Sequence, residues 1–139
     1  RAPEAERQNL SGRVLLAEDN STNARIASKM LERFGLEVSV VETGHEAVRR
    51  SLEGAFDLVL MDWHMPECSG LQATQILRSA NQPLPPIIAM TASAMRGDRQ
   101  ACLDAGMDDF IAKPVGVNDL YSVVSRWLGQ DASRVRSAG

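Results

Sequence analysis

The chain has 139 residues, 44% hydrophobic and 24% charged, and its fifteen basic and eighteen acidic side chains give a net charge of −3. This length and composition are ordinary for one globular domain with a sizeable core. The mild negative charge argues against a nucleic-acid-binding face, and no apolar run is long enough to cross a bilayer.

The two ends of the chain differ in character from its middle. Residues 1–11 and 130–139 are polar and lack periodicity. We therefore expect a linker at 1–11, one folded domain at 12–129, and a flexible tail or linker at 130–139. The chain begins with Arg1 rather than Met, so we expect it to be part of a longer polypeptide. With no signal peptide and no CxxC motif, a cytoplasmic setting is expected, which includes the cytoplasmic part of a membrane-bound sensor.

Five strand-like segments alternate with helical patterns along the domain. The strands are expected at 13–17, 37–42, 57–61, 86–90 and 108–112. The first, third and fourth are almost continuously apolar, as strands covered by helices on both faces must be. The second mixes valines with polar residues, which suits the edge of a sheet.

Apolar stripes at helical spacing fill the gaps between these strands. They comprise Ile26, Ala27, Met30, Leu31 and Phe34; Ala73, Ile76, Leu77 and Ala80; and Leu120, Val123, Val124, Trp127 and Leu128. Helix ends are predicted at Gly35, Gly106 and Gly129, and Gly97 should delay the fourth helix to about 98–105. The alternation predicts an α/β three-layer sandwich whose parallel sheet binds ligands at the carboxyl ends of its strands.

Chemically active side chains follow four of the expected strands. They are Glu18 and Asp19 after the first, Asp62 after the third, Thr91 after the fourth and Lys113 after the fifth. Three carboxylates ~4 Å apart repel by ~4 kcal/mol per pair at an effective dielectric near 20, so stability does not explain them. Mg²⁺ would offset the repulsion, and the lysine adds a second positive charge. The set outlines a phosphoryl-transfer site with a carboxylate as the covalent acceptor.

Four motifs resemble those of the receiver domain of response regulators and hybrid histidine kinases: LLAEDN, MDWHMPECSG, AMTASAM and DDFIAKPV. The spacings are similar too, with 43 residues from Asp19 to Asp62, 29 to Thr91 and 22 to Lys113. The resemblance covers about residues 12–128, and AMRGDRQACLDAGMDDFIAKP is most similar to the C-terminal receivers of hybrid histidine kinases. It implies a flavodoxin-like (βα)5 fold with a five-stranded parallel sheet of order 2-1-3-4-5.

The resemblance also implies roles for single residues. Asp62 would accept a phosphoryl group from phosphohistidine, assisted by Thr91 and Lys113. The metal, Mg²⁺ or Mn²⁺, would be held by Glu18, Asp19, Asp62 and the backbone carbonyl of His64. Thr91 and Phe110 would form a conformational switch, and the peptide bond before Pro114 would be cis. The domain would assist its own phosphorylation and dephosphorylation without being a separate enzyme, although its parent protein would be a kinase.

The implied partners are a histidine kinase domain or a histidine-containing phosphotransfer protein, with neither nucleic acid nor direct membrane contact. The expected docking patch comprises Asn20, Ala24, Ala27, Ser28, Pro114 and Val115. Small residues there would let a partner helix approach, and Ala24→Arg would then slow transfer from the partner but not from acetyl phosphate. Alternatively, Ala24 and Ser28 are ordinary surface positions and Ala27 belongs to the core.

Other functions fit less well. Aspartyl-phosphate phosphatases have a second Asp two residues after the nucleophile, where this chain has His64. A dinucleotide binder would need a GxGxxG loop after the first strand, and EDNSTN stands there. A receiver that acts only as a docking module stays open, because an intact site does not establish that the site is used.

Overall fold

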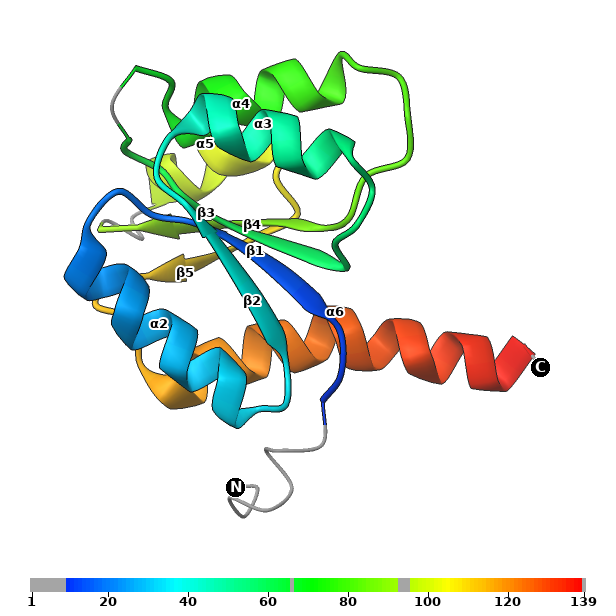
Figure 1. The fold of residues 1–139 in the computed structure, drawn as a ribbon. Helices are drawn as coiled ribbons and strands as arrows, with labels where there is room; N and C mark the ends of the chain where they lie inside the picture. Colours follow the sequence, from blue (N-terminus) through cyan, green and yellow to red (C-terminus); the bar gives the residue numbers. More distant parts are fainter. Residues whose placement is uncertain (1–9, 66, 93–95, 139) are drawn as a thin grey trace.

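The structure is a computed structural model that describes residues 10–65, 67–92 and 96–138 (Figure 1). Strands and helices alternate along these residues: β1 (Arg13–Ala17), α2 (Ser21–Arg33), β2 (Glu37–Val41), α3 (Gly44–Leu52), β3 (Leu58–Asp62), α4 (Gly70–Arg78), β4 (Ile87–Thr91), α5 (Arg96–Ala105), β5 (Asp109–Ala112) and α6 (Val117–Ala138). In the described part of the chain, no helix is both long enough and apolar enough to span a membrane.

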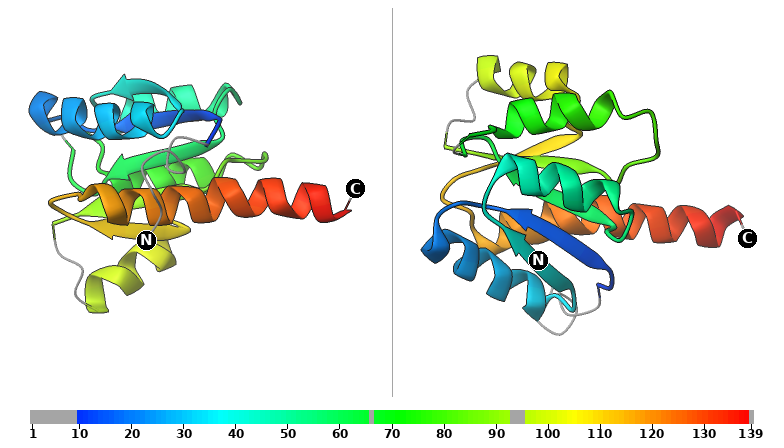
Figure 2. Two further views of the ribbon diagram at one scale, coloured as in Figure 1. Left: turned by 90° about the horizontal axis from the view of Figure 1, so that it is seen from below. Right: turned by 45° about the horizontal axis from the view of Figure 1, so that its top comes forward.

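The five strands form one parallel sheet of order β2-β1-β3-β4-β5, which confirms the predicted flavodoxin-like α/β sandwich. Helices α2 and α6 cover one face, and α3, α4 and α5 cover the other (Figures 1 and 2). Every residue of β3 and β4 is buried, as their continuous apolar runs predict. β2 lies at the edge of the sheet and is only partly buried, as its mixed sequence predicts.

The strand bounds differ slightly from the predicted ones. β3 and β4 each begin and end one residue later than predicted, so Asp62 and Thr91 are the last residues of their strands. β2 ends one residue earlier, β5 starts one residue later, and α5 starts at Arg96, so that Gly97 lies inside it.

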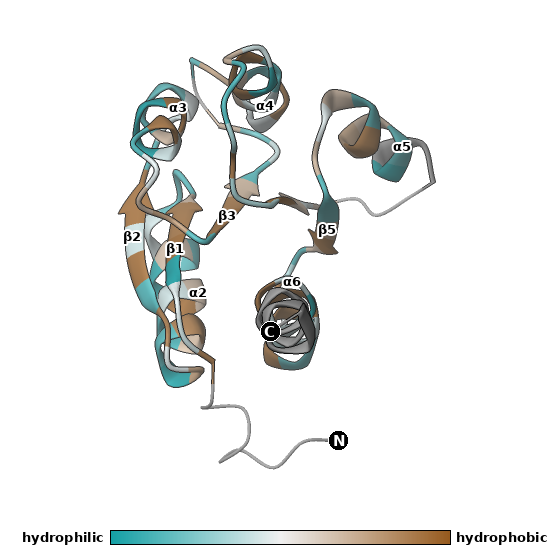
Figure 3. Cartoon of the chain, turned by 90° about the vertical axis from the view of Figure 1, so that its right-hand side faces the viewer, coloured by the Kyte–Doolittle hydropathy of each residue, from teal (hydrophilic) through white to brown (hydrophobic). Residues whose placement is uncertain are grey.

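Two apolar cores form because successive strand residues point to opposite faces of the sheet. Leu16 and Leu60 lie in the core beneath α2 and α6, whereas Leu15 and Val59 lie in the core beneath α3, α4 and α5. Figure 3 shows the apolar strands lying between the two helix layers. The strand ends that carry the polar residues are thereby fixed at one edge of the sheet.

Two isoleucines of the predicted stripes are on the surface instead of in the core. Ile26 is 49% exposed and Ile76 is 44% exposed. α2 turns Ala24, Ala27 and Leu31 toward the sheet, a spacing of i, i+3 and i+7 that leaves Ile26 on the flank of the helix. The predicted apolar stripes therefore included two positions, Ile26 and Ile76, that do not face the core.

Helix α6 is longer than predicted. The expected helix stop at Gly129 is wrong, because the helix continues to Ala138, through most of the segment that we expect to be a flexible tail or linker. A single glycine inside a helix costs only ~1 kcal/mol relative to alanine, and the alanines and arginines that follow favour a helix. Most of the expected linker at 1–11 lies outside the described residues.

One carboxylate fastens α6 to the sheet. Asp109, at the start of β5, accepts hydrogen bonds from Arg126 Nη1 at 2.8 Å and from Trp127 Nε1 at 3.0 Å. Its other oxygen accepts the backbone N–H of Phe110 at 2.8 Å. Charge-assisted bonds of this kind hold an edge strand firmly to the helix that follows it.

Candidate functional site

The parallel register brings the predicted residues together at the carboxyl edge of the sheet. Asp62 pairs with Met90 of β4, and Ala17 pairs with Met61, so Glu18 emerges beside Asp62. The backbone N–H of Lys113 donates to the carbonyl of Thr91 at 2.7 Å, which ties the end of β5 to β4. The sheet thus collects side chains from four strands at one place.

Lys113 lies between two of the carboxylates. Its Nζ is 3.0 Å from Asp62 Oδ2 and 3.2 Å from Glu18 Oε1. Oxygens of Glu18, Asp19 and Asp62 all lie within 4.8 Å of one another. Glu18 and Asp62 are buried, whereas Asp19 is exposed. A hard divalent cation prefers such oxygen donors, and an exposed member leaves room for water and phosphate oxygens, so the residues fit Mg²⁺.

The crowding of charge changes the proton affinities at the site. Burial raises the pKa of the Glu18 carboxyl, and the hydrogen bond and charge of Asp62 raise it further. Burial alone would lower the pKa of the Lys113 ammonium, but the Asp62 and Glu18 carboxylates together raise it above its ordinary value. Lys113 therefore stays charged at neutral pH.

Local hydrogen bonds orient the acidic groups. The backbone N–H of Asn20 donates to Glu18 Oε2 at 3.1 Å, and Asn20 Oδ1 accepts the N–H of Asn23 at 2.9 Å to cap α2. On the other side, the N–H of His64 donates to Asp62 Oδ1 at 3.3 Å. The start of α2 and the loop after β3 thus hold the carboxylates from two directions.

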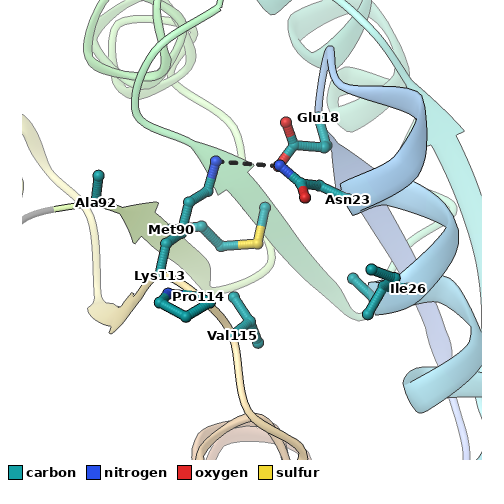
Figure 4. A pocket seen from close by; sticks show the side chains of 9 residues that line it. Glu18, Asn23, Ile26, Met90, Ala92, Lys113, Pro114 and Val115 are labelled. Carbon is teal, nitrogen blue, oxygen red and sulfur yellow. Dashed lines mark ion pairs between the residues drawn. The ribbon is translucent and has the colours of Figure 1, made fainter.

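A groove of about 400 Å³ opens beside this cluster (Figure 4). Asn23 and Ile26 of α2 form one wall, and Pro114 and Val115 form the opposite wall. Its lining is completed by Glu18, Ala27, Met90, Ala92 and Lys113. The groove leads from an apolar surface to the ammonium that contacts Asp62.

The residues of the predicted docking patch differ in how much surface they expose. Ala24 and Ala27 are each 6% exposed and pack in the core, so they offer a partner helix little surface, and Ser28 is half-buried. Pro114 and Val115 do line the groove. The sequence did not indicate four further residues that line the groove, Asn23, Ile26, Met90 and Ala92. A helical stripe does not tell which of two adjacent rows of α2 faces the sheet, and the apolar pattern of a buried strand does not show that the residues at its end border a groove.

Two further predictions concern β5 and the peptide bond that follows Lys113. The Lys113–Pro114 peptide bond is cis, as predicted. Phe110 is half-buried, and the Arg99 guanidinium lies 4.9 Å from the centre of its ring. Cys68 is buried in the loop after β3, and burial raises the pKa of its thiol, which does not favour a reactive thiolate.

Comparison with known proteins agrees with this geometry. The sequence model of the response regulator receiver domain matches residues 14–125. Sensor protein GacS of Pseudomonas syringae pv. syringae is 43% identical over 121 residues, which cover 84% of this chain and 13% of that protein. The histidine-protein kinase BarA of Escherichia coli K12 is 34% identical over 126 residues, which cover 90% of this chain and 14% of that protein. The chain therefore spans only about one seventh of these relatives.

Solved structures show the same arrangement. The receiver domain of a sensor histidine kinase from Pseudomonas aeruginosa PAO1, with magnesium coordinated in its active site cleft, has a TM-score of 0.78 at 40% identity. That match covers 86% of this chain and 98% of the other. A complex of the Saccharomyces cerevisiae phosphotransfer protein Ypd1 with the Ssk1 receiver domain matches with a TM-score of 0.83 at 28% identity, covering 88% of this chain and 92% of the matched one.

Proposed function

Because the chain belongs to the response regulator receiver domain family, we propose that it is a phosphorelay acceptor, taking a phosphoryl group from phosphohistidine onto Asp62. The observation that carries the proposal is the placement of Lys113 between the buried carboxylates of Asp62 and Glu18, with Asp19 beside them. No structural role requires three clustered acids, whereas phosphoryl transfer requires an acceptor carboxylate and positive charge on both sides of it.

The proposed transfer is a displacement at phosphorus. A carboxylate oxygen of Asp62 attacks the phosphorus atom as the bond from phosphorus to the imidazole nitrogen breaks. The nitrogen keeps the bonding electron pair and takes a proton from solvent, and Asp62 becomes an acyl phosphate. Lys113, already 3.0 Å from Asp62, moves its hydrogen bond to a phosphate oxygen. Thr91, at the end of the neighbouring strand, offers its hydroxyl to another oxygen.

We propose that Glu18, Asp19, Asp62 and the backbone carbonyl of His64 hold Mg²⁺ or Mn²⁺. When bound, the ion would neutralise the negative charge of the carboxylates and of the incoming phosphoryl group. The ion pairs of Lys113 already place a positive charge beside the Asp62 and Glu18 carboxylates.

Substitution of Asp19 tests the metal site without disturbing the core. Asp19 is exposed, so Asp19→Asn should leave the fold intact. Loss of one charged ligand should weaken Mg²⁺ binding at least tenfold, or about 1.4 kcal/mol, and slow phosphorylation by acetyl phosphate in proportion. Calorimetric titration with Mg²⁺ and intact-protein mass spectrometry measure the two effects. The exposed Asp104→Asn is the matched control, and normal transfer in excess chelator would refute the metal site.

The groove beside Lys113 is the proposed docking site for a phosphotransfer protein. A phosphohistidine must reach Asp62 from outside, and the groove gives access between α2 and the loop after β5. Ile26, 49% exposed at its wall, can be covered by an apolar side chain of the partner. The complex of Ypd1 with the Ssk1 receiver domain supports a partner of this kind.

Two exposed isoleucines on opposite faces of the sheet provide a controlled test. Ile26→Asp should slow transfer from a phosphotransfer protein at least tenfold, because a buried charge would then face the apolar partner. Ile76→Asp, which alters a side chain of similar exposure on α4, should not slow it. Phosphorylation by acetyl phosphate should proceed at the wild-type rate in both variants. Equal transfer by both variants would place the partner elsewhere.

We further propose that phosphorylation shifts the protein between two conformations through Thr91 and Phe110. A full shift from 1:99 to 99:1 needs about 5.5 kcal/mol. A charge-assisted bond from Lys113 and a bond from Thr91 could contribute about 3–4 kcal/mol, so the shift should be partial. Hydrogen exchange with and without beryllofluoride should change over residues 99–115, where Arg99 covers Phe110. Unchanged exchange there would contradict the switch.

The relatives suggest the setting in which the domain works. We propose that it is the receiver of a larger, cytoplasmically oriented histidine kinase, because it covers only 13–14% of the kinases that it resembles. Detection of a full-length polypeptide carrying kinase peptides, by mass spectrometry of the native source, would test this proposal.

A further inference from the structure

Two glycines lie where helices begin against the loop that follows β3. Gly44 is the first residue of α3 and Gly70 is the first residue of α4, and both are buried. Neither has a positive φ, so their backbone conformation is open to any residue. The requirement for glycine at these two positions is therefore one of space.

Gly70 packs directly on the backbone of the acceptor residue. A Cβ built there would overlap the carbonyl oxygen of Asp62 and would lie 3.2 Å from Met61 Cγ. The N–H of Gly70 also donates to the carbonyl of Trp63 at 3.0 Å. The backbone of β3 cannot bend to relieve such an overlap, because both of its neighbours in the sheet hold it.

Gly44 makes the equivalent contact at the far end of the same loop. A Cβ there would overlap the carbonyl oxygen of Cys68 and would lie 2.8 Å from Cys68 Cβ. Cys68 immediately precedes Ser69, which with Gln72 caps the start of α4 through reciprocal hydrogen bonds of 3.0 and 3.1 Å, so a shift of Cys68 would disturb this cap. The loop is thus held between two helix starts that touch it backbone to backbone.

We infer that Gly70 and Gly44 are positioning residues for phosphoryl transfer, which fix the end of β3 that carries the Asp62 carboxylate and the following loop that carries the His64 carbonyl. This inference rests on the proposed function. A displacement of ~1 Å at a reacting group can slow a reaction ~10²-fold, and a Cβ at Gly70 would impose a shift on Asp62 itself. Helix propensity alone predicts the opposite, since alanine favours a helix over glycine by ~1 kcal/mol.

The test compares Gly70→Ala and Gly44→Ala with Gly116→Ala, where the added methyl group meets no atom within 4 Å. Circular dichroism at low temperature establishes folding, calorimetry measures Mg²⁺ affinity, and mass spectrometry follows phosphorylation by acetyl phosphate. Gly70→Ala should weaken Mg²⁺ binding at least ~10-fold and slow phosphorylation by a larger factor. Gly44→Ala should have a smaller effect of the same sign, and Gly116→Ala none.

The outcomes separate this inference from the proposed function. Wild-type Mg²⁺ affinity and phosphorylation rate in folded Gly70→Ala would overturn the positioning role alone. Failure of both Gly70→Ala and Gly44→Ala to fold would also overturn it, because the glycines would then serve the fold and not the site. Absence of Mg²⁺ binding and phosphorylation in the wild type and in Gly116→Ala would overturn the proposed function, and this inference with it.

Discussion

Replacement of Asp62 by asparagine should reduce phosphorylation to background, both from acetyl phosphate and from a phosphotransfer protein. The amide keeps the shape of the side chain but has no anionic oxygen to attack phosphorus. We expect the variant to fold, because Lys113 keeps its 3.2 Å ion pair with Glu18. Intact-protein mass spectrometry would show one phosphoryl group on the wild type and none on Asp62→Asn.

The chemistry of the bond gives an independent check. An acyl phosphate on Asp62 is labile in both acid and alkali and is cleaved by hydroxylamine, whereas a phosphoester of serine or threonine is stable to acid and to hydroxylamine. Asp104→Asn, at an exposed position on α5, should be phosphorylated like the wild type. Undiminished labelling of Asp62→Asn would show that another residue is the acceptor.

Replacement of Ala24 by arginine should lower the free energy of unfolding by about 3 kcal/mol or more. Ala24 is 6% exposed and lies on the face of α2 that packs against the sheet. Arginine would overpack this contact, and its guanidinium would be buried with no acidic partner or would push the helix away. Urea unfolding followed by circular dichroism measures the change in the free energy of unfolding, which appears as a lower midpoint urea concentration with an unchanged m-value.

The neighbouring surface position supplies the control. Ile26→Arg places the same side chain on the exposed flank of the same helix and should change stability by less than about 1 kcal/mol. A wild-type midpoint for Ala24→Arg would mean that Ala24 faces solvent. Because Ala24→Arg would disturb the core and not only the surface, a change in transfer rate in this variant would not locate a partner.

The burial of Ala24 and the exposure of Ile26 could not be predicted from the sequence. Periodicity established that α2 is a helix with one buried side, but two rows 100° apart are both compatible with apolar residues at 26, 27, 30, 31 and 34. Only the position of the sheet decides between them. Large apolar side chains are usually assigned to the core and small ones to the surface, but here the alanines are buried and the isoleucine is exposed. The helix approaches the sheet closely at Ala24 and Ala27, where only small side chains fit.

The acidic cluster was predictable for a different reason. Its residues follow strands, and parallel strands place their carboxyl ends at one edge whatever the details of packing. Glu18, Asp62 and Lys113 therefore meet as predicted. The end of α6 was not predictable in this way, because the choice between helix and coil after Gly129 involves small differences in propensity.

The length of α6 has a mechanical consequence. Asp109 accepts hydrogen bonds from Arg126 and Trp127 of this helix. Eleven residues follow Trp127 before the helix ends at Ala138, and Figure 1 shows this end of the helix extending away from the sheet. At 1.5 Å per residue this segment is a lever arm of ~16 Å whose fulcrum is a carboxylate on the strand next to the acceptor site. A tilt of ~10° at the fulcrum moves the far end by ~3 Å, about the length of a hydrogen bond. A small adjustment of β5 that tilted the helix in this way would therefore be magnified at its far end to a scale at which side-chain contacts form or break.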